Sequence, residues 1–279
     1  NTTVDGVVYN LRPYNSINDM MSSYGFQQTH NISATGGNTK SSYRMSLGYV
    51  NEDGILVTNK DSYSRYNVSG YINSHAIPWL RPELDIKYTS SQRKLPESNA
   101  PYGIWGSAIA FHSYYPIGSI MNNNEEYFYN SPSYLIERAF PTTTDMDNLR
   151  LAGKVTITPF KDLNIIGEYT INKQFSDKTQ FDPIFTYMRS QDNILENSTT
   201  PANSKFYHTD EKSNYNALHL YSDYTYKFKE HTFKIMSGFN QEKYSWQQFY
   251  NTRAEMINQN LPSISGGVGE VFADDAYSE

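Results

Sequence analysis

The stretch Tyr43-Arg44-Met45-Ser46-Leu47-Gly48-Tyr49 alternates large apolar residues with small or polar ones. Successive side chains of a β-strand point to opposite faces, so Tyr43, Met45, Leu47 and Tyr49 would share one face of an extended chain. The pattern therefore predicts a strand with one apolar and one polar surface. At least six further segments repeat it, and the central question is whether their apolar faces lie against a second sheet or against lipid.

The composition narrows the function classes. Of the 279 residues, 38% are hydrophobic and 15% are aromatic, with 25 tyrosines, and Tyr and Phe both favour strands. The net charge of -6 and the lack of a basic patch argue against nucleic-acid binding. The chain has no cysteine, which excludes disulfides and cysteine-based metal or nucleophilic sites. It also has no run of about 18 apolar residues, so no transmembrane helix is expected.

Eight strands are predicted from the alternation. They cover residues 26–35, 41–52, 63–74, 80–92, 147–158, 162–173, 214–228 and 231–247. Such strands are about 10 to 16 residues long, whereas strands of globular proteins are usually about 5 to 6 residues and a tilted strand crosses a bilayer in about 9 to 11. Charged residues in mid-strand fall on the polar face, as a water-filled lumen would allow. They are Arg44, Lys87, Arg150, Lys154, Glu168 and Lys234.

The predicted connections alternate between short and long. Residues 36–40, 76–79, 159–161 and 229–230 are turn-like, whereas residues 94–146 and 174–213 form long excursions. In an up-and-down barrel this puts tight turns at one rim and long loops at the other, the pattern of outer-membrane barrels. A soluble β-sandwich also alternates apolar and polar residues, but loops of about 40 to 50 residues are rare in compact soluble domains. The pattern favours an antiparallel transmembrane β-barrel.

Several segments resemble, in the same order, the SusC/RagA-type TonB-dependent transporters of Bacteroidota. Residues 25–37 are similar to one stretch of that family, and Tyr43 to Ile55 follow its pattern YxxSxGYxxxxGI. Residues 63–67 are similar to YxRYN, and residues 77–80 to a turn containing Trp-Leu. Residues 131–135 resemble an NPxxxL entry into a strand, residues 231–239 resemble HxxxxxxGF, and residues 258–267 are similar to the loop that follows. The resemblance spans most of residues 17–267.

The resemblance implies that residues 1–279 are part of one TonB-dependent receptor β-barrel domain, with about eight strands of a barrel of about 22. Both ends are expected to be cuts through a longer protein, with the plug domain and the C-terminal strands absent. We therefore expect that this segment cannot insert or transport alone, because open sheet edges are not tolerated in lipid. The implied activity is import of oligosaccharides or peptides across the cell outer membrane. The implied partners are a SusD-like surface lipoprotein and, through the missing part of the chain, the TonB-ExbB-ExbD complex.

Other interpretations of the sequence pattern remain open. A passive outer-membrane porin and a soluble β-sandwich glycan-binding or adhesin module share parts of the pattern, and a phospholipase-type barrel enzyme is a more distant one. We expect no enzymatic activity, no cofactor and no metal, because the six histidines are scattered and no serine lies in a Gly-x-Ser-x-Gly motif. The acidic pairs Glu125/Glu126 and Asp145/Asp147 are interpreted as solvated loop residues rather than Ca²⁺ ligands.

Aromatic residues provide the candidate sites. Trp79 lies in a short turn, and Tyr244 and Trp246 lie near the far end of the last predicted strand, where aromatic girdles meet the membrane interface. A second group lies in the longest loop, in part within an apolar stretch, residues 104–115, that could form a short helix. These aromatics could stack on a ligand or contact a partner, or simply fold the loop. They are Trp105, Phe111, Tyr114, Tyr115, Tyr127 and Tyr129.

Overall fold

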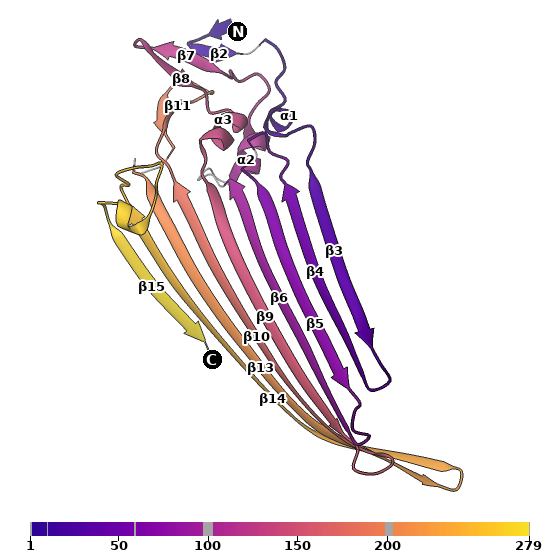
Figure 1. Cartoon of the computed structure of the whole chain (residues 1–279). Coiled ribbons are helices and arrows are strands. Elements are labelled where there is room, and N and C mark those ends of the chain that lie inside the picture. Colours follow the sequence, from indigo (N-terminus) through magenta and orange to yellow (C-terminus); the bar gives the residue numbers. More distant parts are fainter. Residues whose placement is uncertain (1, 10, 59, 97–102, 199–202, 279) are drawn as a thin grey trace.

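The computed structural model describes residues 2–9, 11–58, 60–96, 103–198 and 203–278. Over these residues its main feature is one antiparallel sheet of nine strands, in the order β15-β14-β13-β10-β9-β6-β5-β4-β3 (Figure 1). Consecutive strands of the sheet are neighbours in it, so the sheet is an up-and-down meander. Its strands are β3 (Gln27–Gly37), β4 (Ser41–Asp53), β5 (Ser62–Ser74), β6 (Leu80–Pro96), β9 (Pro141–Ile157), β10 (Leu163–Asp182), β13 (Lys205–Phe228), β14 (His231–Ala254) and β15 (Val271–Ser278).

The remaining elements gather at one end of the sheet, where the long connections emerge, and the short turns lie at the opposite end (Figure 1). This confirms the predicted alternation of short and long connections. These elements are β1 (Thr2–Val4), β2 (Val7–Tyr9), α1 (Ser16–Met20), α2 (Gly103–Ala110), β7 (Ser119–Asn122), β8 (Glu125–Phe128), α3 (Pro132–Arg138), β11 (Thr186–Met188), β12 (Leu195–Asn197) and the 3-10 helix η1 (Ile264–Gly266). None of the described helices is long and apolar enough to cross a membrane.

The apolar face of the sheet is bare in the part of the chain that the structure describes. Leu47 is 55% exposed, Ile165 44% and Leu220 46%, although all three lie in mid-strand. No second layer of the described residues covers them, and most buried hydrophobic side chains lie in the connections instead. A β-sandwich would bury these residues against a second sheet. The structure therefore contradicts the sandwich alternative and agrees with a sheet whose apolar face meets another apolar medium.

The apolar residues form a belt that slants across the sheet. In the ladder, Leu47 of β4 is paired with Val68 of β5, Val68 with Tyr88 of β6, and Tyr88 with Leu149 of β9. The same row continues across β10 to Asn214 of β13, which is polar. In β13 the apolar side chains of this face lie around Leu220, about six residues nearer the short turn. Six residues at about 3.4 Å, over five strand spacings of about 4.8 Å, correspond to an inclination of about 40°. Strands of membrane barrels tilt by about 35–45°, so the belt would lie level in a bilayer if these strands were tilted in that way.

The opposite face carries the charged residues and pairs them across strands. Glu83 of β6 lies 3.2 Å from the Arg81 guanidinium and 3.8 Å from the Lys154 ammonium group of β9. The Tyr71 hydroxyl donates a 2.9 Å hydrogen bond to the same carboxylate. The register also pairs Lys154 with Glu168 of β10. The predicted placement of the mid-strand charges on one polar face is thus confirmed at these positions.

Three details differ from the predictions. The strands reach further toward the long connections than expected, most clearly in β10 and β13, because both faces are polar there and the alternation disappears. β15 was missed, since no strand was predicted after residue 247. The segment that begins at Pro132 was expected to enter a strand, but it forms helix α3, with proline in the first turn, where its missing N–H costs nothing.

The two faces of β10 offer a matched test at adjacent isoleucines. Ile165 lies on the apolar face, whereas Ile166 lies on the charged face, paired with Thr156 and Tyr221. In the complete protein folded into lipid vesicles, we expect Ile165→Lys to lower the free energy of unfolding by roughly 1–3 kcal/mol, because a lysine would face hydrocarbon. Ile166→Lys should cost much less. Equal losses for the two variants, measured by urea titration, would contradict the assignment of the faces.

Candidate functional site

The connections at the long-loop end form a compact layer over the ends of the strands. Its small hydrophobic core consists of Met20, Leu56, Ile104, Ala108 and Ile136, all at most 7% exposed. These residues come from the N-terminal segment, the β4–β5 connection and the β6–β9 connection. The layer therefore has its own core, whereas the sheet below it has almost none. Segments far apart in sequence are held there by burial of apolar surface.

The β4–β5 connection, residues 54–61, is shaped by one aspartate. The Asp61 carboxylate accepts hydrogen bonds from the backbone N–H of Ile55 at 2.8 Å and of Leu56 at 3.3 Å. A Cβ atom on Gly54 would lie 1.8 Å from this carboxylate, so any larger residue would displace Asp61 from these hydrogen bonds. This gives a physical reason for the Gly54-Ile55 pair, which the sequence pattern singled out. This turn places Leu56 in the buried core of the layer.

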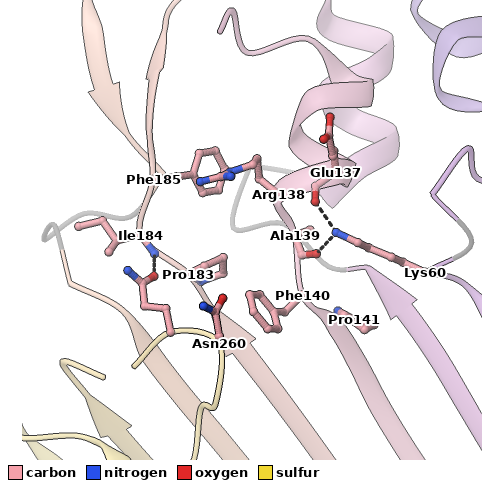
Figure 2. Close-up of a pocket in the computed structure, with 11 residues that line it drawn as sticks. Lys60, Glu137, Arg138, Ala139, Phe140, Pro141, Pro183, Ile184, Phe185 and Asn260 are labelled. Atoms are coloured by element: carbon pink, nitrogen blue, oxygen red, sulfur yellow. Dashed lines mark hydrogen bonds between the residues drawn. The ribbon is translucent and has the colours of Figure 1, made fainter. Parts of the chain in front are cut away.

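Lys60 closes the C-terminal end of helix α3. Its ammonium group donates to the carbonyl oxygens of Ile136 at 3.3 Å, Ala139 at 2.9 Å and Glu137 (Figure 2). The last carbonyls of a helix have no intrahelical partner and carry partial negative charge, which a cation compensates. Burial lowers the pKa of Lys60, and the nearby Glu137 carboxylate partly opposes that change. Lys60 thereby ties the β4–β5 connection to the β6–β9 connection.

A cavity of about 580 Å³ lies beside this contact (Figure 2). It is bounded by four connections, and the backbone N–H of Ile184 donates a 2.7 Å hydrogen bond to the Gln259 side chain, which links two of them. The lining residues are Lys60, Glu137, Arg138, Ala139, Phe140, Pro141, Pro183, Ile184, Phe185, Gln259 and Asn260. The volume falls within the range of small-molecule sites, which are usually lined by apolar groups and a few convergent polar ones.

Arg138 and Phe185 give the cavity its chemical character. The Arg138 guanidinium lies 5.4 Å from the centre of the Phe185 ring, within cation–π range, as Figure 2 shows. Phe185 also contacts Tyr134 edge-on at 5.9 Å, and Phe140 contacts Phe181 edge-on at 4.9 Å. A guanidinium stacked on an aromatic ring suits a carboxylate or a polar planar group, because its fork of N–H donors is held flat. The arrangement can bind a peptide or sugar fragment but contains no nucleophile–base pair.

A second arginine holds the β11–β12 hairpin of the β10–β13 connection together. Arg189 donates to Asp192 and, at 2.5 Å, to Glu196, closing the hairpin of β11 and β12. The Arg189 guanidinium holds the pKa of Asp192 below its usual range. Burial, with help from the Glu196 carboxylate, raises the pKa of Tyr187 to about 12. Asp192 therefore stays ionised and Tyr187 keeps its proton at neutral pH.

Three of the predicted loop aromatics lie together. Phe111 contacts Tyr115 at 5.4 Å, and Tyr115 contacts Tyr114 at 5.1 Å, both edge-on. His112 stacks on Tyr114, and Tyr9 and Tyr14 of the N-terminal segment join the group. We call this set the aromatic cluster: Tyr9, Tyr14, Phe111, His112, Tyr114 and Tyr115. It lies beyond the C-terminal end of α2, whose presence agrees with the expected short helix within residues 104–115.

The other predicted loop residues are dispersed. Trp105 is 47% exposed on α2, and Tyr127 lies in the β7–β8 hairpin, where its hydroxyl donates to Glu125. Tyr129 is only 2% exposed, and its hydroxyl donates a 3.2 Å hydrogen bond to Asn193. Tyr129 thus links the β6–β9 connection to the β10–β13 connection, and it offers no surface to a ligand in this structure. A binding role for the exposed members remains a prediction.

The three proposed girdle residues lie at different places. Trp79 is 51% exposed in the turn between β5 and β6, at the short-turn end, in keeping with a membrane-interface position. In β14, however, the unbroken ladder puts Tyr244 and Trp246 on the same face as Lys234 and Glu242. Alternation therefore turns both side chains toward the charged face, away from the apolar belt. The girdle role stays a prediction for Trp79 and is not favoured for the other two.

The cavity residues Lys60, Arg138, Gln259 and Asn260 were not found from the sequence. They lie in three different connections, and nothing in their local sequence indicates that they meet. A local signal existed only for α3, because proline is common in the first turn of a helix, but the Pro132 segment was interpreted as the entry to a strand.

Comparisons with known proteins point to one fold. No family model and no curated protein matches this chain. Solved structures similar to it include the RagAB peptide importer in the closed-closed state (TM-score 0.73, 12% identity, 97% of this chain and 31% of that chain), the same importer in the open-open state (0.71, 12%, 96% and 30%), and the RagAB peptide transporter (0.70, 13%, 99% and 31%). The chain thus spans about a third of the length of these proteins. The likeness confirms, at the level of the fold, the expected β-barrel segment and its resemblance to SusC/RagA-type transporters.

Lys60 offers a test of how the loop layer is held together. Lys60→Met removes the cation from the α3 carbonyls, and we expect a local loss of about 1–2 kcal/mol, since hydrogen bonds from charged donors are among the stronger ones. Amide hydrogen exchange within α3 of the complete protein should then become about 5- to 30-fold faster. Lys40→Met, in the exposed β3–β4 turn, is the control and should leave α3 unchanged. Unaltered exchange in the Lys60 variant would show that the contact does not hold the layer.

Proposed function

We propose that this chain is a segment of the barrel of a TonB-dependent outer-membrane importer of the SusC/RagA type. The observation that carries the proposal is the fold match along nearly the whole chain to the RagAB peptide importer. The bare apolar belt, its slant and the one-sided distribution of connections support it independently. In this proposal residues 1–279 belong to one barrel domain, located in the cell outer membrane.

The two faces of the sheet would then have separate roles. The apolar belt would face lipid, and the ion-paired face around Glu83 and Lys154 would line the water-filled interior of the barrel. A hydrated cargo can pass such a wall without losing its solvation, whereas the hydrocarbon outside keeps the strands in place. The long connections would lie on the extracellular side, where they can capture cargo. No step of this function requires a cofactor or a chemical reaction.

The proposed cargo is a peptide or an oligosaccharide. The cavity that contains Arg138 and Phe185 can bind a peptide carboxylate through the guanidinium or a sugar ring through the aromatic face. The exposed side chains of Tyr114, in the aromatic cluster, and Trp105 would offer a second surface for cargo or for a SusD-like surface lipoprotein. Energy would come from the TonB-ExbB-ExbD complex, acting through parts of the protein outside these residues.

The cavity gives the function a direct test. A deletion strain is complemented with the complete transporter or with its Arg138→Ala/Phe185→Ala variant, and uptake of fluorescent peptides and oligosaccharides is measured. We expect the double variant to lose roughly tenfold in uptake of the preferred cargo, because one stacked charge-assisted contact contributes about 1.5–3 kcal/mol. Lys161→Ala, at the short-turn end, is the matched control. The unaltered transporter and the two variants must reach the cell surface in equal amounts.

The same strain separates an importer from a passive porin. Uptake through a TonB-dependent importer stops when the tonB gene is deleted, whereas diffusion through a porin continues. Uptake that persists without TonB would overturn the proposal in favour of the porin. Uptake that the double variant leaves intact would exclude the cavity as a cargo contact.

A further inference from the structure

Three potential metal ligands meet across two neighbouring strands. Asp177 lies on β10, and His208 and Asp210 lie on β13, where the ladder pairs Asp177 with Asp210 directly. The Nε2 atom of His208 is 3.0 Å from the Asp177 Oδ2 atom and 3.6 Å from the Asp210 Oδ1 atom. All three ligand atoms lie within 4.8 Å of one another, and all three residues are partly buried. The sequence gave no sign of this group, since Asp177 lies about 30 residues before His208 and Asp210.

A hydrogen-bonded ion pair does not account for the whole arrangement. The imidazole Nε2 atom carries at most one proton, and this proton can serve the Asp177 carboxylate at 3.0 Å. Asp210 lies at 3.6 Å, which is beyond a hydrogen bond, so its charge is left beside a second carboxylate. A cation between the three groups would satisfy both carboxylates at once.

The neighbouring strand provides a separate observation. The ladder pairs His208 with Asn251 of β14 on the same face. Opposed side chains in a sheet have Cβ atoms about 4.5–5.5 Å apart, so the Asn251 amide lies beside the imidazole. Its Oδ1 atom is buried and has no hydrogen-bond partner. A buried amide oxygen without a partner costs free energy, and a cation would compensate it as a fourth ligand.

The surrounding charges also favour a cation. Asp145 of β9 is paired with Asp177 in the ladder and accepts a 2.8 Å hydrogen bond from Gln92. Lys212, on the same face of β13, has its ammonium group 4.9 Å from the centre of the Phe175 ring. Three carboxylates therefore lie in one row of the sheet, and the Lys212 ammonium group is directed to the Phe175 ring.

We propose that Asp177, His208 and Asp210 bind a divalent metal ion of the Zn²⁺ class, with Asn251 as an additional oxygen ligand. Zn²⁺ takes imidazole nitrogen at about 2.0–2.1 Å and carboxylate oxygen at about 2.0–2.2 Å, which in a tetrahedral site puts the ligand atoms about 3.4 Å apart. The separations of 3.0 and 3.6 Å bracket this value. The imidazole selects such a metal over Ca²⁺ and Mg²⁺, which prefer oxygen ligands alone.

The position of the site assigns it a structural role. Its residues lie on the face of the apolar belt, two positions beyond Phe175 toward the long connections, and not on the ion-paired face. A metal here would clamp β10, β13 and β14 together where they leave the belt. It would stabilise the barrel without touching cargo, so the proposal is independent of the transport function.

The test uses the complete protein, purified in detergent and freed of metal with a chelator. Zn²⁺ affinity is measured by competition with a chromophoric chelator, and Co²⁺ is added to look for the visible absorption of a nitrogen- and oxygen-ligated ion. We expect about one Zn²⁺ per chain that is lost, or bound at least about tenfold more weakly, in His208→Gln and in Asp177→Asn/Asp210→Asn. Asp145→Asn, which alters the same row but no proposed ligand, should bind as the unaltered protein does.

Further readouts keep the result interpretable. Bound Zn²⁺ should raise the unfolding temperature of the unaltered protein and of Asp145→Asn, but not that of His208→Gln, and heat-modifiable migration shows whether each variant is folded. If the double variant does not fold, His208→Gln decides. Zn²⁺ binding that His208→Gln leaves unchanged would overturn the proposal, as would the absence of saturable binding. Binding of Ca²⁺ in preference to Zn²⁺ would overturn the assigned metal class.

Discussion

The structure depends on an unbroken antiparallel ladder that runs from β3 to β15. Because the register advances without a slip across β10, β13 and β14, the alternation stays in phase from strand to strand, and the apolar belt stays on one face of the sheet. A single inserted residue would move the following apolar side chains to the charged face. The backbone hydrogen bonds thus do more than hold the strands together. They sort the side chains into one face suited to hydrocarbon and another suited to water.

This sorting inverts the usual relation between core and surface. Leu47 and Leu220 are about half exposed in mid-strand, whereas Met20 and Ile136, in the connections, are completely buried. The hydrophobic effect therefore acts in two places. In the loop layer it joins distant segments in the ordinary way, around a small core. On the sheet, apolar surface remains that no described residue covers, and soluble monomers rarely expose such a surface over many strands.

The sequence was informative where one physical rule acted locally. Alternation around Tyr43 to Tyr49 fixed the faces, and the turn-like residues located the end of the sheet with short connections. The same rule lost its signal beyond the belt, where both faces of β10 and β13 carry polar residues, so these strands were predicted too short. β15 has a similarly mixed pattern of Val271, Phe272 and two aspartates, and was missed. The girdle role of Tyr244 and Trp246 rested on their place along the strand, without counting which face each one takes.

The sites were harder to predict, because their residues meet only through the register. Lys60 and Arg138 come from separate connections, and Asp177 and His208 are brought together by strand pairing that no local pattern encodes. Gly54 is the exception, because the residue that a larger side chain would displace, Asp61, lies only seven residues further along the chain. Local sequence thus determines the faces of the sheet, and the choice of strand partners determines which groups meet on each face.

The same ladder limits what this sheet can do by itself. The edge strands β3 and β15 are exposed along nearly their whole length, and each presents one row of backbone groups with no partner in the sheet. In water such an edge invites association, and in hydrocarbon each unpaired group costs several kcal/mol. Only further strands that close the barrel would satisfy both edges together. The inclination of the belt, about 40°, also requires further strands. A sheet of tilted strands closes into a barrel only when the stagger between neighbouring strands adds up to the required shear.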